Sequence, residues 1–187
     1  MASGQSRRFE GGNKLLADFH GRPLAEYVLQ TARKIPFTSK IVVTRTPEIQ
    51  TLCRALRLPC LLHDFPGLND TIRLGLQALL TAPLDGCLFL QSDQPFLSAD
   101  SINALLLAFF ADPHFIYRLA CGSAVGSPVL FPASLFPALQ ALPDDCGGNV
   151  VLRNHAGLVR TVQAHGPYEL LDADTQEELE RLRMLTV

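Results

Sequence analysis

Apolar positions recur along the chain in two periods, and short polar segments containing Pro, Gly or Asp separate them. Helical spacing marks residues 23 to about 34 and 47 to about 57, with Pro23 and Pro47 suited to a first helical turn. The β-branched run at residues 41–43 predicts a strand between them, and residues 59–62 predict a weaker strand. This alternation predicts an α/β fold with a mostly parallel sheet flanked by helices.

A buried strand is predicted over residues 86–90, where the apolar run is continuous. Before it, Asn69 or Asp70 is suited to cap a helix; after it, a polar segment over 91–95 precedes Ser98, which begins the next helix. Ligands of open α/β sheets bind at the carboxyl ends of the strands. The polar segment is therefore a candidate site.

The second half of the chain continues the alternation, and Thr175 with Glu178 has the capping-box spacing of a last helix through Leu182. Its other predicted elements are strands over residues 115–120, 127–131 and 158–164 and helices over 132–142 and 148–155. No internal repeat or linker interrupts the pattern. The sequence therefore predicts one domain over residues 1–187.

Composition places this 187-residue chain among globular proteins, with 48% hydrophobic and 18% charged residues. A formal net charge of -2 excludes the electrostatic footprint of a protein that coats nucleic acid or an anionic membrane, so any phosphate must be bound locally. The longest apolar run, residues 104–111, is far short of the roughly 20 residues that span a bilayer. Five cysteines without Cys-x-x-Cys spacing indicate buried thiols in a reducing compartment, and we expect a cytoplasmic protein.

Residues 4–14 combine glycines, a hydroxyl and positive charge. Glycines let backbone N–H groups approach phosphate oxygens, Arg8 can bind them through two N–H groups, and Lys14 adds a mobile point charge. A polar, frayed terminus is the alternative interpretation. Lys14 is one of three lysines and lies between Asn13 and the apolar Leu15, which favours a triphosphate site.

Asp93 directly follows an apolar run and is expected at the ligand-binding edge of the sheet. A carboxylate there can bind Mg²⁺, whereas an Asp that only ends the strand is the other interpretation. Asp172 and Asp174 also follow a strand-like segment and could present a second carboxylate, although Asp174 before Thr175 equally suits a helix start. The histidines show no metal-ligand spacing, and Walker and Gly-x-Ser-x-Gly motifs are absent from the sequence.

The order of these motifs resembles that of the molybdenum cofactor cytidylyltransferases, members of a wider superfamily of nucleotidyltransferases with a Rossmann-like sheet. The resemblance covers almost the whole chain. It is carried by Gly4-x-Ser6-x-Arg8, Lys14-Leu15-Leu16, Gly21-Arg22-Pro23-Leu24, Ser92-Asp93-Gln94-Pro95, Gly126-Ser127-Pro128-Val129-Leu130-Phe131-Pro132 and Asp172-Ala173-Asp174-Thr175.

The resemblance also implies a role for individual residues. Nucleotide binding is implied for Ala2, Ser3, Gly4, Ser6, Arg8, Lys14, Thr71 and Asp93, of which Thr71 would contact the base. Catalytic roles are implied for Arg8, Lys14 and Asp93, and Mg²⁺ binding for Asp93 and Asp174. Binding of molybdopterin is implied for Gly126, Pro128, Asp145 and Gly147.

The implied reaction is an in-line attack by the terminal phosphate of molybdopterin on the α-phosphorus of CTP, with release of pyrophosphate. Positioning and stabilisation of negative charge would suffice, without a covalent intermediate. The implied partners are CTP, molybdopterin and a molybdenum hydroxylase that receives the product, with no nucleic acid and no membrane.

One departure from the family concerns the first strand. The family begins with a full strand, whereas only Met1, Ala2 and Ser3 precede Gly4, so we expect the sheet to lack this strand. Each unpaired backbone group left behind would cost about 1 to 3 kcal/mol if buried. We expect either that the natural start lies upstream or that another segment fills the gap.

Two other functions remain open at this stage. The same fold could transfer a nucleotide with another base, such as guanine, or to another acceptor, such as a sugar phosphate, an isoprenoid precursor or a phospholactate. A non-catalytic descendant could instead bind the cofactor or a partner molybdoenzyme, and it would show no stabilisation by nucleotide.

Overall fold

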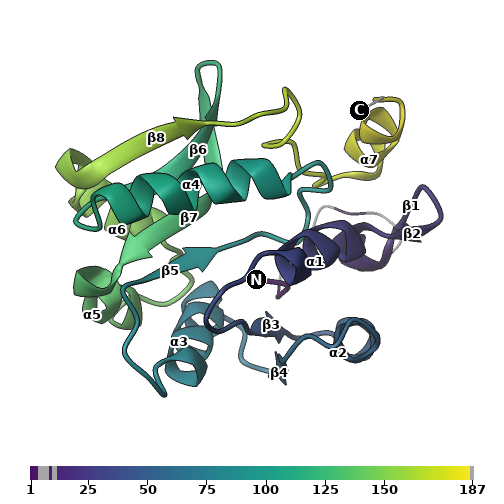
Figure 1. The fold of residues 1–187 in the computed structure, drawn as a ribbon. Helices are drawn as coiled ribbons and strands as arrows, with labels where there is room; N and C mark the ends of the chain where they lie inside the picture. The colour runs from purple at the N-terminus through teal and green to yellow at the C-terminus, as the bar shows by residue number, and fades with distance from the viewer. Residues whose placement is uncertain (4–8, 10–11, 186–187) are drawn as a thin grey trace.

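The structure, a computed structural model, describes residues 1–3, 9 and 12–185. The helices are α1 (Leu24–Lys34), α2 (Pro47–Ala55), α3 (Leu68–Leu79), α4 (Ala99–Ala111), α5 (Phe136–Gln140), α6 (Asn149–Asn154) and α7 (Gln176–Arg183), with short 3-10 helices η1 (Lys14–Leu16), η2 (Ala133–Leu135) and η3 (Ala156–Leu158). The strands are β1 (Asp18–Phe19), β2 (Arg22–Pro23), β3 (Val42–Thr44), β4 (Cys60–Leu62), β5 (Gly86–Phe89), β6 (Ile116–Cys121), β7 (Ala124–Pro132) and β8 (Val159–Gln163). Figure 1 shows their arrangement.

The strands form parallel and antiparallel pairs. β3 pairs with β4 in parallel, and a four-stranded sheet has the order β5-β7-β6-β8, with β6 and β8 parallel. β7 is antiparallel to both β5 and β6. The predicted α/β fold with parallel sheet elements and flanking helices is confirmed, but around β7 the sheet is mixed rather than parallel.

The antiparallel direction of β7 follows from its short connection to β6. Cys121 pairs with Ala124 across a two-residue loop, in which Gly122 has a φ of 59°. Two-residue loops join antiparallel strands and need such positive φ values, whereas parallel strands need a crossover of a dozen or more residues.

Helices cover both faces of the four-stranded sheet, as alternating side chains of β7 require. Leu130 packs with Val28 of α1 and Leu105 of α4 on one face. On the other face, Phe131 packs with Ile72 of α3 and with residues of α5 and α6. Two sides of one strand are thereby buried in separate clusters.

Residues 1–3 lie between β3 and β5 (Figure 1). Ala2 forms a parallel bridge with Thr44, and its N–H donates to the Val43 carbonyl at 2.9 Å. The Met1 nitrogen donates to the Leu90 carbonyl at 2.5 Å on the other side. Residues 1–3 therefore connect β3 with the chain that follows β5.

Several boundaries differ from the sequence-based expectations for physical reasons. The expected helix over residues 132–142 is divided into η2 and α5, because Pro137 lacks the N–H of a continuous helix. The N-cap of α3 is Gly67 rather than Asn69 or Asp70, and Asp70 instead accepts a hydrogen bond from the Gly67 N–H at 3.1 Å. The capping box of Thr175 and Glu178 is confirmed.

The structure bears on the expectations for the cysteines and for membrane-spanning segments. All five cysteines are free thiols, and Cys53 and Cys87 are buried. Within residues 12–185 and the described opening positions, no helix is both long and apolar enough to cross a membrane.

Candidate active site

Lys14 begins η1, and its position is fixed by the residue before it. The Asn13 side chain accepts a hydrogen bond from the Leu15 N–H at 3.0 Å and donates to the Thr46 hydroxyl at 2.8 Å. Leu15 is buried beside α1 and α2. This anchorage leaves Lys14 only 7% exposed, so its ammonium group needs nearby negative charge.

Asp93 lies in the loop that follows β5, between two buried polar residues. The Ser92 hydroxyl donates to the Met1 carbonyl at 2.8 Å. The Gln94 amide donates to the Ser127 carbonyl at 3.1 Å and to the Leu170 carbonyl at 3.4 Å. These bonds tie the loop to the first residues, to β7 and to the segment before α7, so Asp93 lies where these segments meet.

Asp174 reaches the same place from the start of α7. Thr175 caps this helix by accepting from the Glu178 N–H at 3.1 Å, and the Glu178 carboxylate accepts from the Asp174 N–H at 2.8 Å. Ala173 and Leu179 are completely buried. Capping and packing together fix the backbone that carries Asp174. Asp174 therefore belongs to the start of α7 and also directs its carboxylate to this site.

The Lys14 ammonium lies between two carboxylates. Its nitrogen is 2.6 Å from an oxygen of Asp93 and 2.6 Å from an oxygen of Asp174. Asp172 joins them, since oxygens of the three aspartates lie within 4.8 Å of one another. Loss of hydration raises the pKa of Asp172, and the charges of Asp93 and Asp174 raise it further. Among the described residues, one ammonium group lies with three carboxylates, which leaves an excess of negative charge.

The residues of this cluster fit a divalent cation. The second oxygen of Asp93 is buried and lacks a hydrogen-bond partner among the described residues, which is a costly state for a carboxylate. Carboxylate oxygens from Asp93, Asp172 and Asp174 are the donors that Mg²⁺ and Mn²⁺ prefer. The sequence offers Asp172 as a possible second carboxylate at this edge of the sheet, and the structure places it beside Asp93 and Asp174.

The structure describes some of the opening residues that are expected to bind the nucleotide. Gly4, Ser6 and Arg8 lie outside the described residues. Ala2 is buried in the sheet, and Ser3 follows it at the carboxyl end, with its hydroxyl 3.2 Å from the Val43 carbonyl, to which it donates. Thr71 is buried in the first turn of α3, across from Ser3.

His63 connects Ser3 with Thr71, and the sequence had given no reason to select it. Its Nε2 atom lies 3.1 Å from the Ser3 hydroxyl and 3.4 Å from the Thr71 hydroxyl. Its ring stacks on Phe65 with centroids 6.2 Å apart. Burial, followed by the charge of Arg45, lowers the pKa of His63, so its ring is neutral at pH 7. The one sequence feature that could have identified His63 is its position directly after the strand β4.

The residues expected to contact molybdopterin lie on two segments. Gly126 and Pro128 belong to β7, and the Gln94 amide binds the Ser127 carbonyl between them. Asp145 has a φ of 55°, and a side chain at Gly147 would lie within 2.7 Å of Leu68 at the start of α3. The first segment therefore adjoins the Asp93 loop, and the second adjoins the helix that carries Thr71.

Comparison with known proteins is consistent with this arrangement. The family of MobA-like NTP transferase domains matches residues 1–160. The chain is 29% identical to the purine catabolism protein PucB of Bacillus subtilis (strain 168), over 98% of this chain and 93% of that protein. It is 25% identical to the 3-deoxy-manno-octulosonate cytidylyltransferase of Neisseria gonorrhoeae (strain NCCP11945), over 92% and 79%.

A solved structure shows the same fold. Rv0371c of Mycobacterium tuberculosis H37Rv, in complex with manganese, superposes with a TM-score of 0.78 and 21% sequence identity, over 97% of this chain and 94% of that one.

Proposed function

The chain belongs to the family of MobA-like NTP transferase domains, and from this membership we propose that it transfers CMP from CTP to the terminal phosphate of molybdopterin. The observation that carries the proposal is the contact of Lys14 with both Asp93 and Asp174. Three distant parts of the sequence supply one cation and several carboxylates at the carboxyl end of β5. Such a set suits a metal-chelated triphosphate.

In the proposed reaction, an oxygen of the acceptor phosphate forms a bond to the α-phosphorus of CTP. The bond from that phosphorus to the oxygen bridging toward the β-phosphate breaks, and pyrophosphate leaves with the electron pair. Lys14 stabilises the negative charge that spreads over the phosphate oxygens. Asp93, Asp172 and Asp174 would hold a divalent cation, which supplies Lewis-acid charge neutralisation to the phosphates when bound.

We assign the nucleotide base to the cluster that Ser3, His63 and Thr71 form through their hydrogen-bond contacts. Since the Ser3 hydroxyl donates to the Val43 carbonyl, the Nε2 atom of His63 is the donor of the Ser3–His63 pair. The neutral ring then has an acceptor at Nδ1, which is buried without a partner among the described residues. An acceptor suits the exocyclic amino group of cytosine. The N. gonorrhoeae relative, a cytidylyltransferase by name, supports the same base.

Replacement of His63 by Phe is expected to raise KM for CTP about 10-fold while changing kcat little, because a ground-state hydrogen bond of about 1.5 kcal/mol is lost. Phe keeps the stacking on Phe65 and removes both ring nitrogens. Steady-state pyrophosphate release against CTP concentration measures the effect. His114→Phe, at an exposed histidine, is the matched control. An unchanged KM in His63→Phe would show that His63 does not contact the base.

Molybdopterin as acceptor rests on the family resemblance of Gly126, Pro128, Asp145 and Gly147. The geometry supports this acceptor because Gln94, in the loop that carries Asp93, donates a hydrogen bond to the Ser127 carbonyl of β7. A sugar acid is the second candidate acceptor, since one relative is a 3-deoxy-manno-octulosonate cytidylyltransferase by name.

The test is pyrophosphate release with Mg²⁺ and molybdopterin in the presence of CTP, GTP or ATP. We expect turnover with CTP at least about 10-fold faster than with the other nucleotides, the discrimination that one or two base hydrogen bonds provide. Turnover with 3-deoxy-manno-octulosonate but not with molybdopterin would favour the second acceptor. Absence of both turnover and nucleotide-dependent thermal stabilisation would favour a non-catalytic protein.

A further inference from the structure

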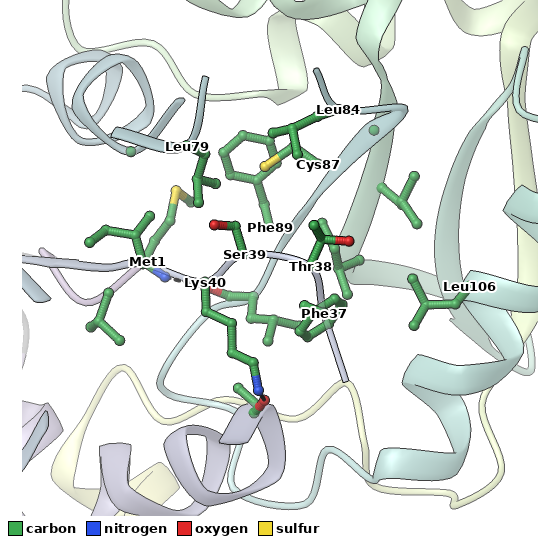
Figure 2. A pocket seen from close by; sticks show the side chains of 18 of the residues that line it. Met1, Phe37, Thr38, Ser39, Lys40, Leu79, Leu84, Cys87, Phe89 and Leu106 are labelled. Carbon is green, nitrogen blue, oxygen red and sulfur yellow. Dashed lines mark hydrogen bonds between the residues drawn. The ribbon is translucent and has the colours of Figure 1, made fainter. Parts of the chain in front are cut away.

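Figure 2 shows an apolar cleft of about 620 Å³ between β3 and β5. Side chains such as Leu79, Phe89 and Leu106 surround it. Lys40 also belongs to its lining, but its ammonium group donates to three backbone carbonyls near the end of α1. This cation is therefore bound within the fold, and the cleft is not part of the Lys14 site.

Arg45, the residue after β3, is a half-buried cation without such partners. Its guanidinium group makes no hydrogen bond or ion pair with any other described residue, and its Nε atom is buried. A buried charged group without a partner is costly for the fold. An unpartnered group of this kind needs an explanation, and a ligand that binds during function provides one.

The parallel pairing of β3 and β4 places Arg45 beside His63. Thr44 and Leu62 lie opposite each other at the ends of the two strands, so the next residues, Arg45 and His63, leave the strands side by side. Burial lowers the pKa of His63, and the charge of Arg45 lowers it further. Arg45 therefore lies next to the cluster that we assign to the base.

The chain on the other side of Arg45 is connected to Lys14. The hydroxyl of Thr46 accepts a hydrogen bond from the Asn13 side chain at 2.8 Å. Asn13 directly precedes Lys14, whose ammonium group contacts the carboxylate cluster. Arg45 therefore lies at the carboxyl end of β3, between the residues assigned to the base and those assigned to the metal and the phosphates.

The carboxylates near His63 do not neutralise Arg45. Asp64 and Asp70 are the acidic groups whose charges act on His63. Asp64 is exposed, and Asp70 lies 3.3 Å from the guanidinium group of Arg73. The positive charge of Arg45 is therefore available to a ligand.

A nucleotide that is bound as proposed above passes Arg45. Its base would lie at His63 and its phosphates at Lys14, so the atoms between them cross the carboxyl end of β3. A guanidinium group is permanently charged, and its parallel N–H groups match two oxygens of a phosphate. A base carbonyl could also accept a hydrogen bond, but it would leave the charge of Arg45 without a counter-charge. The chemistry thus favours a phosphate.

We propose that Arg45 binds a phosphate group of the nucleotide. The inference rests on the proposed function, from which it takes the places of the base and of the metal. Arg45 lies outside the sequence motifs that carry the family resemblance. Together with Lys14, it gives the nucleotide site two described cations from different parts of the chain.

Arg45→Met tests the proposal in calorimetric titrations with CTP and Mg²⁺. We expect the Kd for CTP to rise at least about 10-fold, because a charge-assisted contact is lost. The Kd for cytidine, followed by NMR chemical shifts, should stay unchanged. The same titrations with CDP and CMP identify the phosphate group that Arg45 contacts. At pH 8 His63 stays neutral in both proteins, although loss of Arg45 removes one cause that lowers its pKa.

Thermal unfolding without nucleotide separates a ligand contact from a structural role. Removal of an unpaired, half-buried charge should leave the unfolding midpoint of Arg45→Met unchanged or raise it. Arg45→Lys keeps a positive charge but not the planar fork, and we expect its Kd for CTP to be about 3-fold above that of the wild type. Arg33→Met, at an exposed arginine of α1, is the matched control and should bind CTP like the wild type.

Equal Kd values of the wild type and Arg45→Met for CTP would overturn the proposal. An equal loss of cytidine binding would also overturn it, because Arg45 would then contact the base. A lower unfolding midpoint without nucleotide would do the same, because Arg45 would then support the fold. Absence of CTP binding by the wild type would overturn the proposed function as well. None of these readouts needs an acceptor, so they are independent of molybdopterin.

Discussion

Asp93→Asn is expected to lower the rate of pyrophosphate release about 10³-fold or more while the protein stays folded. Asn has the shape of Asp but lacks the charge. It removes the carboxylate whose second oxygen is buried without a partner among the described residues. Charge stabilisation of a phosphoryl transition state by a metal site amounts to several kcal/mol, and each 1.36 kcal/mol is a factor of ten in rate.

A matched control variant separates this effect from the loss of any carboxylate near β5. Asp85 is exposed and precedes the same strand at its other end, so Asp85→Asn should retain full activity. Thermal unfolding should show that both variants are folded, since Lys14 keeps its contact with Asp174 in Asp93→Asn. Wild-type turnover by folded Asp93→Asn would contradict the proposed site.

Lys14→Met is expected to lose both activity and stability. Met has a similar length but no charge, so it leaves Asp93 and Asp174 without the ammonium that lies 2.6 Å from each. Removal of one partner from a buried ion pair costs about 3 kcal/mol or more, which corresponds to a decrease of about 6–12 °C in the unfolding midpoint. Turnover should fall about 10²-fold or more, because a cation at the phosphates is lost.

The contribution of Lys14 to the stability of the protein depends on pH. Burial lowers the pKa of Lys14, but the charge of Asp93 and hydrogen bonds to both carboxylates outweigh it and raise the pKa above 10.5. The stabilisation from Lys14 is therefore fully present below pH 10.5 and is lost only as the pH rises through the raised pKa. Burial and the neighbouring carboxylates raise the pKa of Asp172, so repulsion within the cluster is relieved as the pH falls, and the stability difference between the variant and the wild type should narrow toward acidic pH.

Urea unfolding from pH 3 to pH 8 measures this difference. Lys34→Met removes an exposed lysine at the end of α1 and should unfold like the wild type at every pH. A Lys14→Met protein as stable as the wild type at pH 7 would show that the ion pairs contribute little.

The parts of the site that the sequence reveals are those encoded locally. The apolar run of β5 followed by polar residues predicts the position of Asp93, because the end of a strand is set by a few neighbouring residues. Thr175 and Glu178 predict the start of α7 in the same way. The sequence favours Lys14 as a site residue because it is one of three lysines and lies between Asn13 and the apolar Leu15.

The remaining features depend on contacts between distant residues. The period of side chains does not give the direction of a strand, so the antiparallel β7 was not expected. His63 shows no metal-ligand spacing in the sequence, and only the fold places it between Ser3 and Thr71. The cleft between β3 and β5 likewise arises from the arrangement of strands that are far apart in the sequence.

The central claim is that Lys14, Asp93 and Asp174 converge on one metal-chelated triphosphate. Titration of Mn²⁺ in the presence of CTP, followed by the electron paramagnetic resonance signal of free Mn²⁺, tests it directly. The account predicts one tightly bound Mn²⁺ per wild-type chain that requires CTP, and at least about 10-fold weaker binding to folded Asp93→Asn and Asp174→Asn variants. Equal Mn²⁺ binding by the wild type and both variants would contradict it.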